Sequence, residues 1–517
     1  MTTLRARWLG TVGYQEAETL QRALHGRSDD DYLLLLEHPH VYTLGSSAKL
    51  DHVLCDPATV GAELIEADRG GDVTYHGPGQ LVGYPIVSLA EWRAGQRDVV
   101  AYVRALEDVL TATLADFGIA AGRSEGYTGV WVGDEKIAAI GVRVSRGRTR
   151  HGFALNVDPD LSMFSHIVPC GIRGRGVTSM AQLIGAVDIE AVGERVTVHF
   201  AERFGHDSIE RAAVSKHRPA DGIPIAITTK RPEWMRVRAH FDEEYIQLKQ
   251  LVRDQGLHTV CEEAGCPNIY ECWSDRTATF MILGDRCTRA CGFCQIDTRK
   301  PLPVDEDEPR RVAEAVATLG LAHAVITCVA RDDLPDGGAS IFAATVDAIR
   351  SHVPGCGVEL LIADNKGDPA SLETIFAARP DVLNHNLETV ARLQRVARPS
   401  AGYARSLAVL ARARDAELTT KSGLILGMGE TADEVKVAIT DLRNVGVDLL
   451  TIGQYLRPSA QHLPVVKWWH PDEFAELSEF SESLGFAHVE SGPLVRSSYH
   501  AREGAARMDP WLTASPR

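Results

Sequence analysis

The sequence of 517 residues has no long hydrophobic run. Its longest purely aliphatic stretch, Leu33 to Leu36, is far too short to cross a bilayer. The segment that follows Arg5 and Arg7 contains glycine, tyrosine and glutamate rather than the apolar stretch of a signal peptide. We therefore expect a soluble, cytoplasmic protein that makes no contact with a membrane.

An excess of positive charge is also missing. The chain has 54 Lys and Arg against 70 Asp and Glu, a formal net charge of -16, and acidic residues outnumber basic ones both before and after residue 220. Broad nucleic-acid-binding surfaces are basic, so we expect no nucleic-acid partner. Hydrophobic residues at 44% and charged residues at 24% are ordinary for a globular protein, which excludes disorder for most of the chain.

Cysteine is scarce outside one region. Six of the ten cysteines lie between Cys261 and Cys294. The others are Cys55, Cys170, Cys328 and Cys356. A domain held together by disulfides would be short and rich in cysteine throughout, so this clustering favours metal or cluster ligation instead.

A segment rich in proline divides the chain. Residues 214–232 contain Pro219, Pro224 and Pro232 between polar residues and show no periodicity, which is typical of a linker. We therefore predict one domain at 1–213, a linker at 214–232 and a second part at 233–517.

The two parts differ in their pattern of elements. The first part predicts a mixed α+β domain, with a strand at Asp31–Glu37, short strands at Val130–Val132, Ile137–Val144 and Gly152–Val157, and helices at Val99–Phe117 and Glu190–Phe204. The second part alternates strands with helices, which predicts a parallel α/β sheet, open or closed into a partial barrel. The predicted strands are Thr279–Leu283, Ala324–Val329, Val358–Ile362, Val382–Asn386, Gly423–Leu426 and Leu449–Ile452. The predicted helices are Glu308–Leu319, Ser340–His352, Ser371–Ala377, Glu388–Arg414 with a break at Pro399, and Ala432–Asn444.

Two incomplete sets of three cysteines stand at the start of the second part. Cys287, Cys291 and Cys294 follow the first predicted strand with C-x3-C-x2-C spacing, which can hold three irons of a [4Fe–4S] cluster and leave the fourth open. Upstream lies a further set, Cys261, Cys266 and Cys272, in CEEAGCPNIYECW. Two sets predict two clusters. A structural zinc site is the alternative, although zinc sites usually have four ligands in paired doublets.

The C-x3-C-x2-C spacing resembles the radical S-adenosylmethionine (SAM) superfamily, and residues 231–499 closely resemble the lipoyl synthase family. The motifs that carry this likeness are GDRCTRACGFC at 284–294, RDDLPDGGA at 331–339, NHNLETV at 384–390, GLILGMGE at 423–430, TIGQYLRPS at 451–459 and RSSYHA at 496–501. The resemblance implies a partial (β/α)6 radical SAM barrel at 277–480, between an auxiliary-cluster extension at 233–276 and a C-terminal segment at 481–517.

The resemblance also implies the chemistry. The second cysteine set would bind SAM through its open iron, and the first would hold an auxiliary [4Fe–4S] cluster with Ser498 as its fourth ligand. That cluster would supply the two sulfurs that are inserted at C6 and C8 of an octanoyl chain. An electron donor and an iron–sulfur carrier are implied as partners. The sequence departs from the family at Cys328 and Ala330, where Ser and Asp are expected, and it lacks the usual Pro before Asp364.

Cys170 is a candidate nucleophile in the first part. It precedes a run of glycine and arginine, GIRGRG at 171–176, which favours an accessible thiolate. A buried, inert thiol is the alternative reading of a lone cysteine. Lys136 could supply a second positive charge.

Residues 14–204 resemble the lipoyl(octanoyl) transferase family, whose fold is that of biotin and lipoate ligases. The motifs are RGGDVTYHGPGQLVGYPI at 69–86, GDEKIAAIGVR at 133–143, HGFALNV at 151–157 and PCGI at 169–172. The resemblance implies that Cys170 takes the acyl group from octanoyl-acyl carrier protein as a thioester, that Lys136 lowers the thiol pKa, and that a lysine of an apo lipoyl domain receives the acyl group. The acceptors would be lipoyl domains of 2-oxoacid dehydrogenase E2 subunits and the glycine cleavage H protein.

The same resemblance implies an acyl-binding pocket. Its residues would be Arg69, Gly70, Gly71, Asp72, Val73, Thr74, Tyr75, His76, Ala139, Ile140, Gly141, Gly152, Phe153 and Ala154. Ala139 stands where a Ser is frequent. Three alternatives stay open: an ATP-dependent biotin-type ligase for the first part, another sulfur-inserting radical SAM enzyme for the second, and an iron–sulfur electron carrier.

Overall fold

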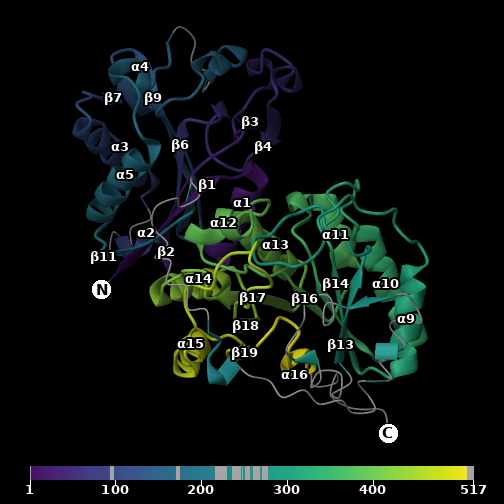
Figure 1. Cartoon of the computed structure of the whole chain (residues 1–517). Helices are drawn as coiled ribbons and strands as arrows, with labels where there is room; N and C mark the ends of the chain where they lie inside the picture. The colour runs from purple at the N-terminus through teal and green to yellow at the C-terminus, as the bar shows by residue number, and fades with distance from the viewer. Residues whose placement is uncertain are drawn as a thin grey trace. The chain divides into compact units, whose positions relative to one another are not determined.

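A computed structural model describes residues 2–92, 98–169, 175–215, 230–235, 246, 249–250, 257–259, 268–269 and 277–508. The chain divides into two compact units, Met1–Val214 and Ser215–Arg517, which are taken separately below (Figure 1). Residues 216–229 of the predicted linker lie outside the described residues. Among the described helices, none combines the length and the apolar character needed to cross a membrane.

The first unit is built on a mixed sheet of eight strands. They are β1 (Thr3–Thr11), β2 (Asp31–Glu37), β6 (Gln80–Ile86), β7 (Gly122–Ser124), β8 (Tyr127–Val132), β9 (Glu135–Ser145), β10 (Arg148–Asn156) and β11 (Ser208–Ala213). The sheet order is β11-β1-β2-β6-β10-β9-β8-β7. The first three strands are parallel, and every pair from β2 to β7 is antiparallel.

Two long helices cover a face of this sheet, and a smaller sheet completes the unit. The helices α3 (Val99–Asp116) and α5 (Ile189–Phe204) share one apolar core with β1, β2 and β10. The small sheet has the order β4 (Glu63–Glu66), β3 (Val41–Leu44), β5 (Val73–His76). The remaining helices are α1 (Tyr14–Arg27), α2 (Leu89–Trp92), α4 (Met180–Ile184), η1 (Leu50–His52), η2 (Pro57–Val60) and η3 (Leu161–His166). The predicted elements are all present, whereas β1, β11 and α1 were not predicted.

The second unit contains an open sheet with seven parallel strands. They are β13 (Thr277–Ile282), β14 (His323–Cys328), β15 (Gly357–Leu361), β16 (Val382–Asn384), β17 (Thr420–Leu426), β18 (Leu449–Gln454) and β19 (His488–Ser491), in sequence order across the sheet. The short β12 (His258–Thr259) pairs antiparallel with β13. Among the described strands the sheet does not close, so the expected partial barrel is present, with β19 beyond the six predicted strands.

Helices connect these strands in the βαβ pattern that parallel pairing requires. They are α9 (Glu308–Leu319), α10 (Ala339–His352), α11 (Pro369–Ala377), α12 (Gln394–Ala397), α13 (Tyr403–Asp415), α14 (Ala432–Asn444), α15 (Pro471–Ser483) and α16 (Ala501–Met508), with η5 (Glu233–Met235), η6 (Asn365–Gly367) and η7 (Ala391–Leu393). The predicted break at Pro399 separates α12 from α13. The prediction that this helix begins at Glu388 was wrong, because Glu388 has a φ of 68° and its backbone bonds to β17.

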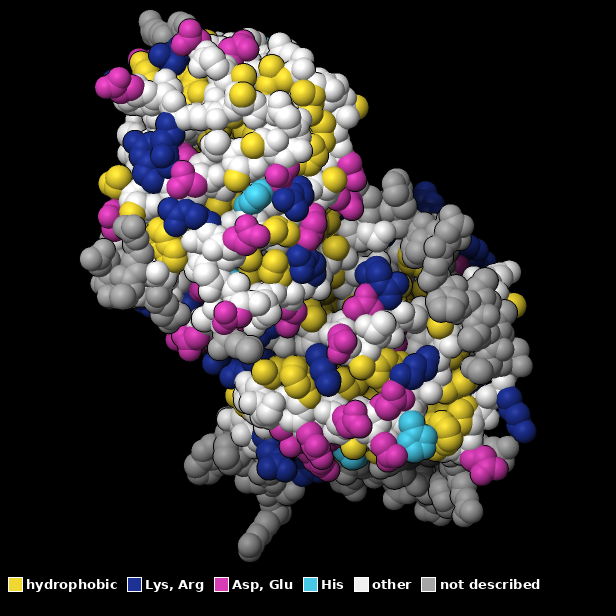
Figure 2. Space-filling view, turned by 90° about the vertical axis from the view of Figure 1, so that its left-hand side faces the viewer, with side chains coloured by type: hydrophobic (Ala, Val, Ile, Leu, Met, Phe, Trp, Pro, Cys, Tyr) yellow, Lys and Arg dark blue, Asp and Glu magenta, His cyan; other side chains and the backbone are white. Residues whose placement is uncertain are grey.

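Charged side chains are mixed on the surface. In Figure 2, acidic and basic side chains are interspersed over the face that is shown, with hydrophobic side chains between them.

One ion pair lies inside the parallel sheet. Lys421 Nζ on β17 donates to both carboxylate oxygens of Glu359 on β15 at 3.1 Å, and Asn384 Nδ2 on β16 donates to the same carboxylate at 2.9 Å. Glu359 is fully buried and Lys421 is nearly so. Burial alone would raise the pKa of Glu359, but Lys421, His323 and Asn384 together outweigh it and the pKa falls.

We predict that Lys421→Met destabilises the second unit. The change strands a buried carboxylate without its cation, which costs about 3–5 kcal/mol of unfolding free energy. Guanidinium titration followed by circular dichroism measures it, with the exposed Lys300→Met as the matched control, expected to change the free energy by no more than about 0.5 kcal/mol. Equal stability of both variants would contradict the prediction.

Candidate functional sites

A cavity of about 560 Å³ opens at the carboxyl ends of the parallel strands. Its wall includes residues at or just after the ends of β14, β15, β17 and β18, together with the loop that carries the second cysteine set. This is the edge of a parallel α/β sheet where ligands bind. Cys287, Cys291 and Cys294 all line the cavity, so the structure brings these three predicted ligands together.

The cysteine loop is fixed by backbone contacts from distant segments. Cys287 N donates to Asp297 O at 2.7 Å, and Gly292 N donates to Ala397 O at 2.8 Å. Gly292 O accepts from Leu463 N at 2.9 Å. A Cβ on Gly292 would lie 2.9 Å from the Leu463 side chain, which explains why glycine stands between the second and third cysteines.

The thiols are chemically suited to a metal cluster. Burial raises the pKa of Cys291 to about 12 and also raises the pKa of Cys294. These thiols are therefore protonated at neutral pH until a metal displaces the protons. Cys287 Sγ accepts weak hydrogen bonds from the backbone N–H groups of Ala330 at 3.3 Å and Arg289 at 3.4 Å. Three soft donors on one loop, facing one cavity, fit an iron–sulfur cluster with an open iron.

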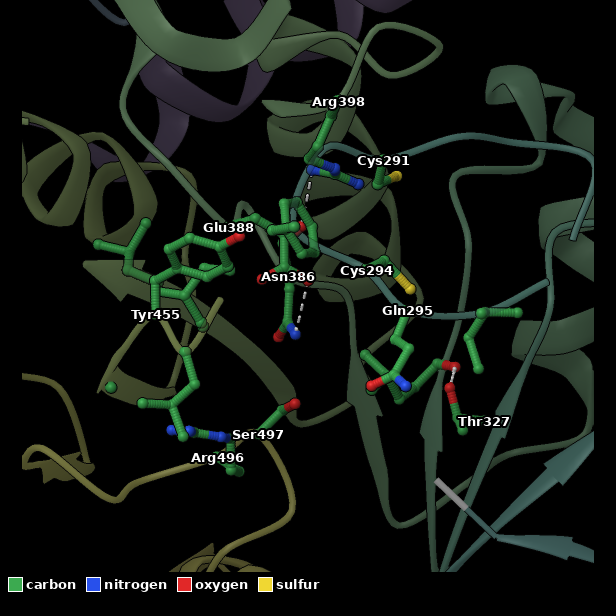
Figure 3. A pocket seen from close by; sticks show the side chains of 18 of the residues that line it. Cys291, Cys294, Gln295, Thr327, Asn386, Glu388, Arg398, Tyr455, Arg496 and Ser497 are labelled. Atoms are coloured by element: carbon green, nitrogen blue, oxygen red, sulfur yellow. Dashed lines mark hydrogen bonds between the residues drawn. The ribbon is translucent and has the colours of Figure 1, made fainter. Parts of the chain in front are cut away.

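A polar wall stands beside the cysteines (Figure 3). Asn386 Nδ2 donates to Glu388 Oε1 at 3.1 Å, and Arg398 Nη1 donates to Asn386 O at 2.9 Å. Burial raises the pKa of Glu388, an effect that the Arg398 charge partly opposes. The positive φ of Glu388 is an unusual conformation for a residue with a side chain. Asn386 and Glu388 belong to the NHNLETV motif, but no role was predicted for them from the sequence.

The opposite wall comes from the end of the unit. In Figure 3, Tyr455, Arg496 and Ser497 lie across the cavity from Cys291 and Cys294. Ser498 follows Ser497 and does not itself line this cavity. The other predicted auxiliary ligands, Cys261, Cys266 and Cys272, lie outside the described residues.

The departures from the expected family pattern fall on this cavity. Cys328 lines it at the end of β14, and burial raises its pKa to about 12, so it is a neutral thiol. Ala330 contributes backbone groups: its N–H reaches Cys287 Sγ, and its carbonyl accepts from Thr288 N at 2.9 Å. These contacts do not depend on the side chain at position 330.

The first unit has a second cavity, of about 600 Å³. Most predicted pocket residues line it: Arg69, Gly70, Gly71, Asp72, Thr74, His76, Ala139, Ile140, Gly141, Gly152, Phe153 and Ala154, together with Lys136. Val73 and Tyr75 do not. They alternate with Thr74 and His76 along β5 and pack into a separate apolar cluster with Tyr42 and Phe164.

Lys136 lies on β9 beside the stretch that follows Cys170. Its backbone N–H donates to Gly176 O at 3.0 Å, and its carbonyl accepts from Thr178 N at 3.1 Å. The side chain is only 8% exposed, and its Nζ is 4.9 Å from the ring centroid of Trp131. Cys170 itself lies outside the described residues.

Histidines and tyrosines also line this cavity. Burial lowers the pKa of His76 well below its usual value, so the ring is neutral, and its Nδ1 bonds to Gln80 Oε1 at 2.8 Å. The sequence missed Tyr14, Tyr84 and His151 as lining residues. His151 immediately precedes the predicted Gly152, but a single histidine beside a motif carries no signal of its own.

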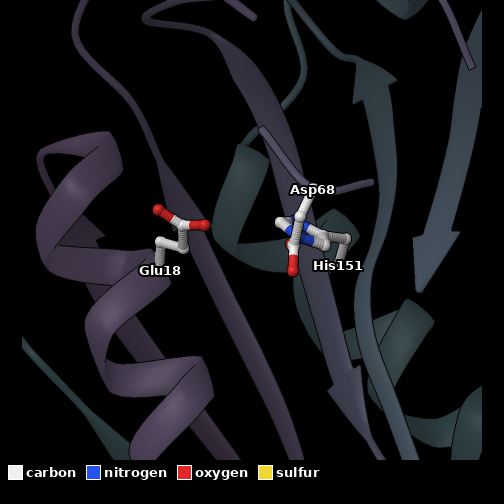
Figure 4. Close-up of side chains that lie close together, drawn as sticks. All are labelled: Glu18, Asp68 and His151. Atoms are coloured by element: carbon white, nitrogen blue, oxygen red, sulfur yellow. The ribbon is translucent and has the colours of Figure 1, made fainter. Parts of the chain in front are cut away.

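His151 also belongs to a cluster that resembles a metal site in outline (Figure 4). Its Nε2 bonds to Asp68 Oδ1 at 2.7 Å, and Glu18 lies nearby. However, Arg150 pairs with Asp68 at 2.5 Å and Arg22 pairs with Glu18 at 2.8 Å. Both carboxylates are therefore already neutralised, which disfavours a cation here.

Comparisons with known proteins find a different family in each of the two units. The family model "Lipoyl protein ligase A/B catalytic domain" matches residues 14–201, and "Radical SAM superfamily" matches residues 281–442. Lipoyl synthases of Mycobacterium bovis (strain BCG / Pasteur 1173P2) and Mycobacterium tuberculosis (strain ATCC 25618 / H37Rv) are each 60% identical over 272 residues, covering 53% of this chain and 88% of theirs. That of Mycobacterium sp. (strain KMS) is 58% identical over 287 residues, with 55% and 88% covered.

Solved structures were also found for the first unit. A lipoate-protein ligase A bound with ATP has 19% identity and a TM-score of 0.35, covering 42% of this chain and 90% of that one. A bi-partite lipoate protein ligase from Thermoplasma acidophilum has 19% identity and a TM-score of 0.34, with 42% and 89% covered. By the mycobacterial relatives and the two family models, the chain belongs to the lipoyl synthase family through its second part and carries a lipoyl protein ligase A/B catalytic domain in its first.

Proposed function

We propose that the chain performs two successive steps of protein lipoylation. The first unit transfers an octanoyl group from acyl carrier protein to a lysine of a lipoyl domain. The second unit inserts sulfur at C6 and C8 of the attached chain, which gives lipoyl-lysine. The observation that carries this proposal is the presence, in one chain, of a lipoyl protein ligase A/B catalytic domain, a radical SAM domain, and a 272-residue stretch that is 60% identical to lipoyl synthases.

In the first step, Cys170 acts as the nucleophile. Its thiolate attacks the thioester carbonyl of octanoyl-carrier protein, and the carrier thiol leaves with a proton. The amine of the acceptor lysine then attacks the Cys170 thioester, forms the amide and releases the Cys170 thiol. Lys136 stabilises the thiolate and carries the proton between the two half-reactions. Support comes from the strand pairing that holds Lys136 against Gly176 and Thr178, shortly after Cys170.

The cavity of the first unit suits the acyl chain. Phe153 and Ala154 on β10 and Ala139 and Ile140 on β9 offer an apolar lining. Gly152 allows β10 to lie close to β6 beside the cavity, because a Cβ there would collide with Gly83 O at 2.2 Å. Ala139 offers no hydroxyl, so the substrate is held at this position by shape rather than by a hydrogen bond.

For the second step, Cys287, Cys291 and Cys294 would hold a [4Fe–4S] cluster. Together with SAM, this cluster would supply the radical chemistry needed to remove hydrogen from unactivated methylenes, which no side-chain base can do. The protein residues position the substrates and shield them from solvent. Glu388 and Arg398 present opposite charges to the polar parts of SAM. The wall formed by Tyr455, Arg496 and Ser497 confines the octanoyl chain between SAM and the sulfur source.

The sulfur source is an auxiliary [4Fe–4S] cluster held by Cys261, Cys266, Cys272 and Ser498. A serine oxygen is a poorer ligand for iron than a thiolate, so Ser498 would hold its iron less firmly than the three cysteines hold theirs. Ser498 lies one residue from the cavity wall at Ser497, which supports this placement. An electron donor and an iron–sulfur carrier are then required partners.

One mass spectrum tests the whole proposal. Anaerobically reconstituted protein is mixed with apo lipoyl domain, octanoyl-carrier protein, SAM and a reductant, without ATP. The lipoyl domain should gain an octanoyl group and then two sulfurs. The H protein of glycine cleavage is tested as a second acceptor. A strict requirement for ATP and free octanoate would instead support a ligase in the first unit.

We predict that Cys170→Ala abolishes octanoyl transfer and that Lys136→Ala lowers its rate about 10²–10⁴-fold. The first variant removes the nucleophile, and the second removes the group that activates it. Initial rates of octanoyl-lipoyl-domain formation measure both effects. Cys55→Ala and Lys49→Ala, in the same unit but outside the described lining of its cavity, serve as controls and should retain full activity. Full activity of Cys170→Ala would rule out the thioester route.

We also predict that Cys291→Ala prevents SAM cleavage without affecting octanoyl transfer. Two thiolates cannot hold a stable cubane, so iron at this site is lost. Iron content and the yield of 5′-deoxyadenosine measure the effect. Cys356→Ala, which removes a buried thiol from the apolar core, is the control and should cleave SAM normally. If Cys291→Ala cleaved SAM as well as the parent protein does, the assignment of the cluster to this loop would be wrong.

A further inference from the structure

Arg289 lies inside the C-x3-C-x2-C motif, between the first and second cysteines, and the proposed function assigns it no role. Its guanidinium forms a two-pronged contact with one carboxylate: Nε donates to Asp332 Oδ2 at 2.7 Å, and Nη2 donates to Asp332 Oδ1 at 2.8 Å. The third nitrogen, Nη1, is 2.6 Å from Asp364 Oδ1. The planar guanidinium of Arg289 therefore uses two nitrogens on Asp332 and the third on Asp364.

The two acids belong to different strand ends. Asp332 lies in the loop after β14, and Asp364 lies in the loop after β15. Asp364 is fully buried and Arg289 is 8% exposed. Three nitrogens of the guanidinium meet carboxylate oxygens at 2.7, 2.8 and 2.6 Å, so the buried charge is paired with two acids. A buried charge of this kind is stable only while its partners hold it.

The same two loops are joined at Cys287. Thr288 Oγ1 donates to Ala330 O at 2.9 Å and accepts from Asp332 N at 3.0 Å. The N–H groups of Arg289 and Ala330 both point at Cys287 Sγ, at 3.4 and 3.3 Å. One N–H comes from the cysteine loop and the other from the loop after β14. The Arg289–Asp332 contact links these same two loops.

We infer that Arg289 is a positioning residue that clamps the cysteine loop to the ends of β14 and β15 and so keeps two N–H donors on the sulfur of Cys287. The inference rests on the proposed cluster site. Hydrogen bonds to a ligating sulfur stabilise the reduced, more negative cluster, as does a nearby positive charge. Loss of the Arg289 side chain frees the two loops that carry these N–H donors and leaves Asp332 and Asp364 without their cation, so it makes the cluster harder to reduce.

The test compares Arg289→Gln with Arg289→Lys. Both are made in the full chain with Cys261, Cys266 and Cys272 changed to Ala, so that one cluster gives the signal. Arg310→Gln is the matched control, since Arg310 makes a similar two-pronged contact with Asp307 on the exposed face of α9. Iron per chain, the midpoint potential, the electron paramagnetic resonance spectrum with and without SAM, and the melting temperature are recorded.

We expect Arg289→Gln to lower the midpoint potential, alter the spectrum that SAM induces and reduce the affinity for iron about 10–100-fold. Arg289→Lys keeps the charge but loses the fork, so its potential should fall between those of Arg289→Gln and the parent. If Arg289→Gln does not fold, the Lys variant carries the test. Arg310→Gln should match the parent in every readout.

Two results overturn different statements. If the parent chain with its single cysteine set binds no cluster, the proposed cluster site fails. If the parent binds a cluster that responds to SAM and Arg289→Lys has the parent's potential and spectrum, the clamp is wrong although the proposed function stands.

Discussion

The parallel hydrogen-bonded ladder from β13 to β19 is the constraint on which the second unit depends. Because every strand runs in the same direction, all carboxyl ends meet at one edge, and residues far apart in sequence line one cavity. The cysteine loop, the Asn386–Glu388 stretch and the Arg496–Ser497 stretch come from different loops at this edge. A single antiparallel strand within the ladder would move one of these stretches to the opposite end of the sheet.

The second unit places several charges inside this framework, and each is held by named partners. Glu359 is neutralised by Lys421 in the middle of the sheet, and Arg289 is neutralised by two acids at its edge. Glu388 differs, because burial raises its pKa and the charge of Arg398 and the hydrogen bond from Asn386 only partly oppose that rise. Arg289 and Glu388 both line the cavity, but only the charge of Glu388 is incompletely compensated, as is common where a site binds a charged ligand.

The sequence predicted much of this arrangement because the informative residues are close together in sequence. The alternation of strands and helices from residue 279 to 452 is regular, and three cysteines within one loop indicate a cluster site on their own. Predictions failed where contacts between distant parts of the chain decide the backbone conformation or the direction of a side chain. Glu388 continues a helical pattern, yet its backbone bonds to β17. Val73 and Tyr75 belong to a pocket motif, yet a strand directs alternate side chains to opposite faces. Arg289 finds its partners 43 and 75 positions later, which no local pattern reveals.

The backbone contacts of the cysteine loop have a consequence for the order of events during synthesis. Gly292 bonds to Ala397 and to Leu463, and both follow it by a long stretch of chain. A ribosome that has just released the three cysteines has not yet made the residues that fix their loop. The thiols therefore remain loosely arranged until the chain beyond Leu463 has emerged. Under the proposed function, a cluster would therefore meet a fixed site only after the chain beyond Leu463 has emerged.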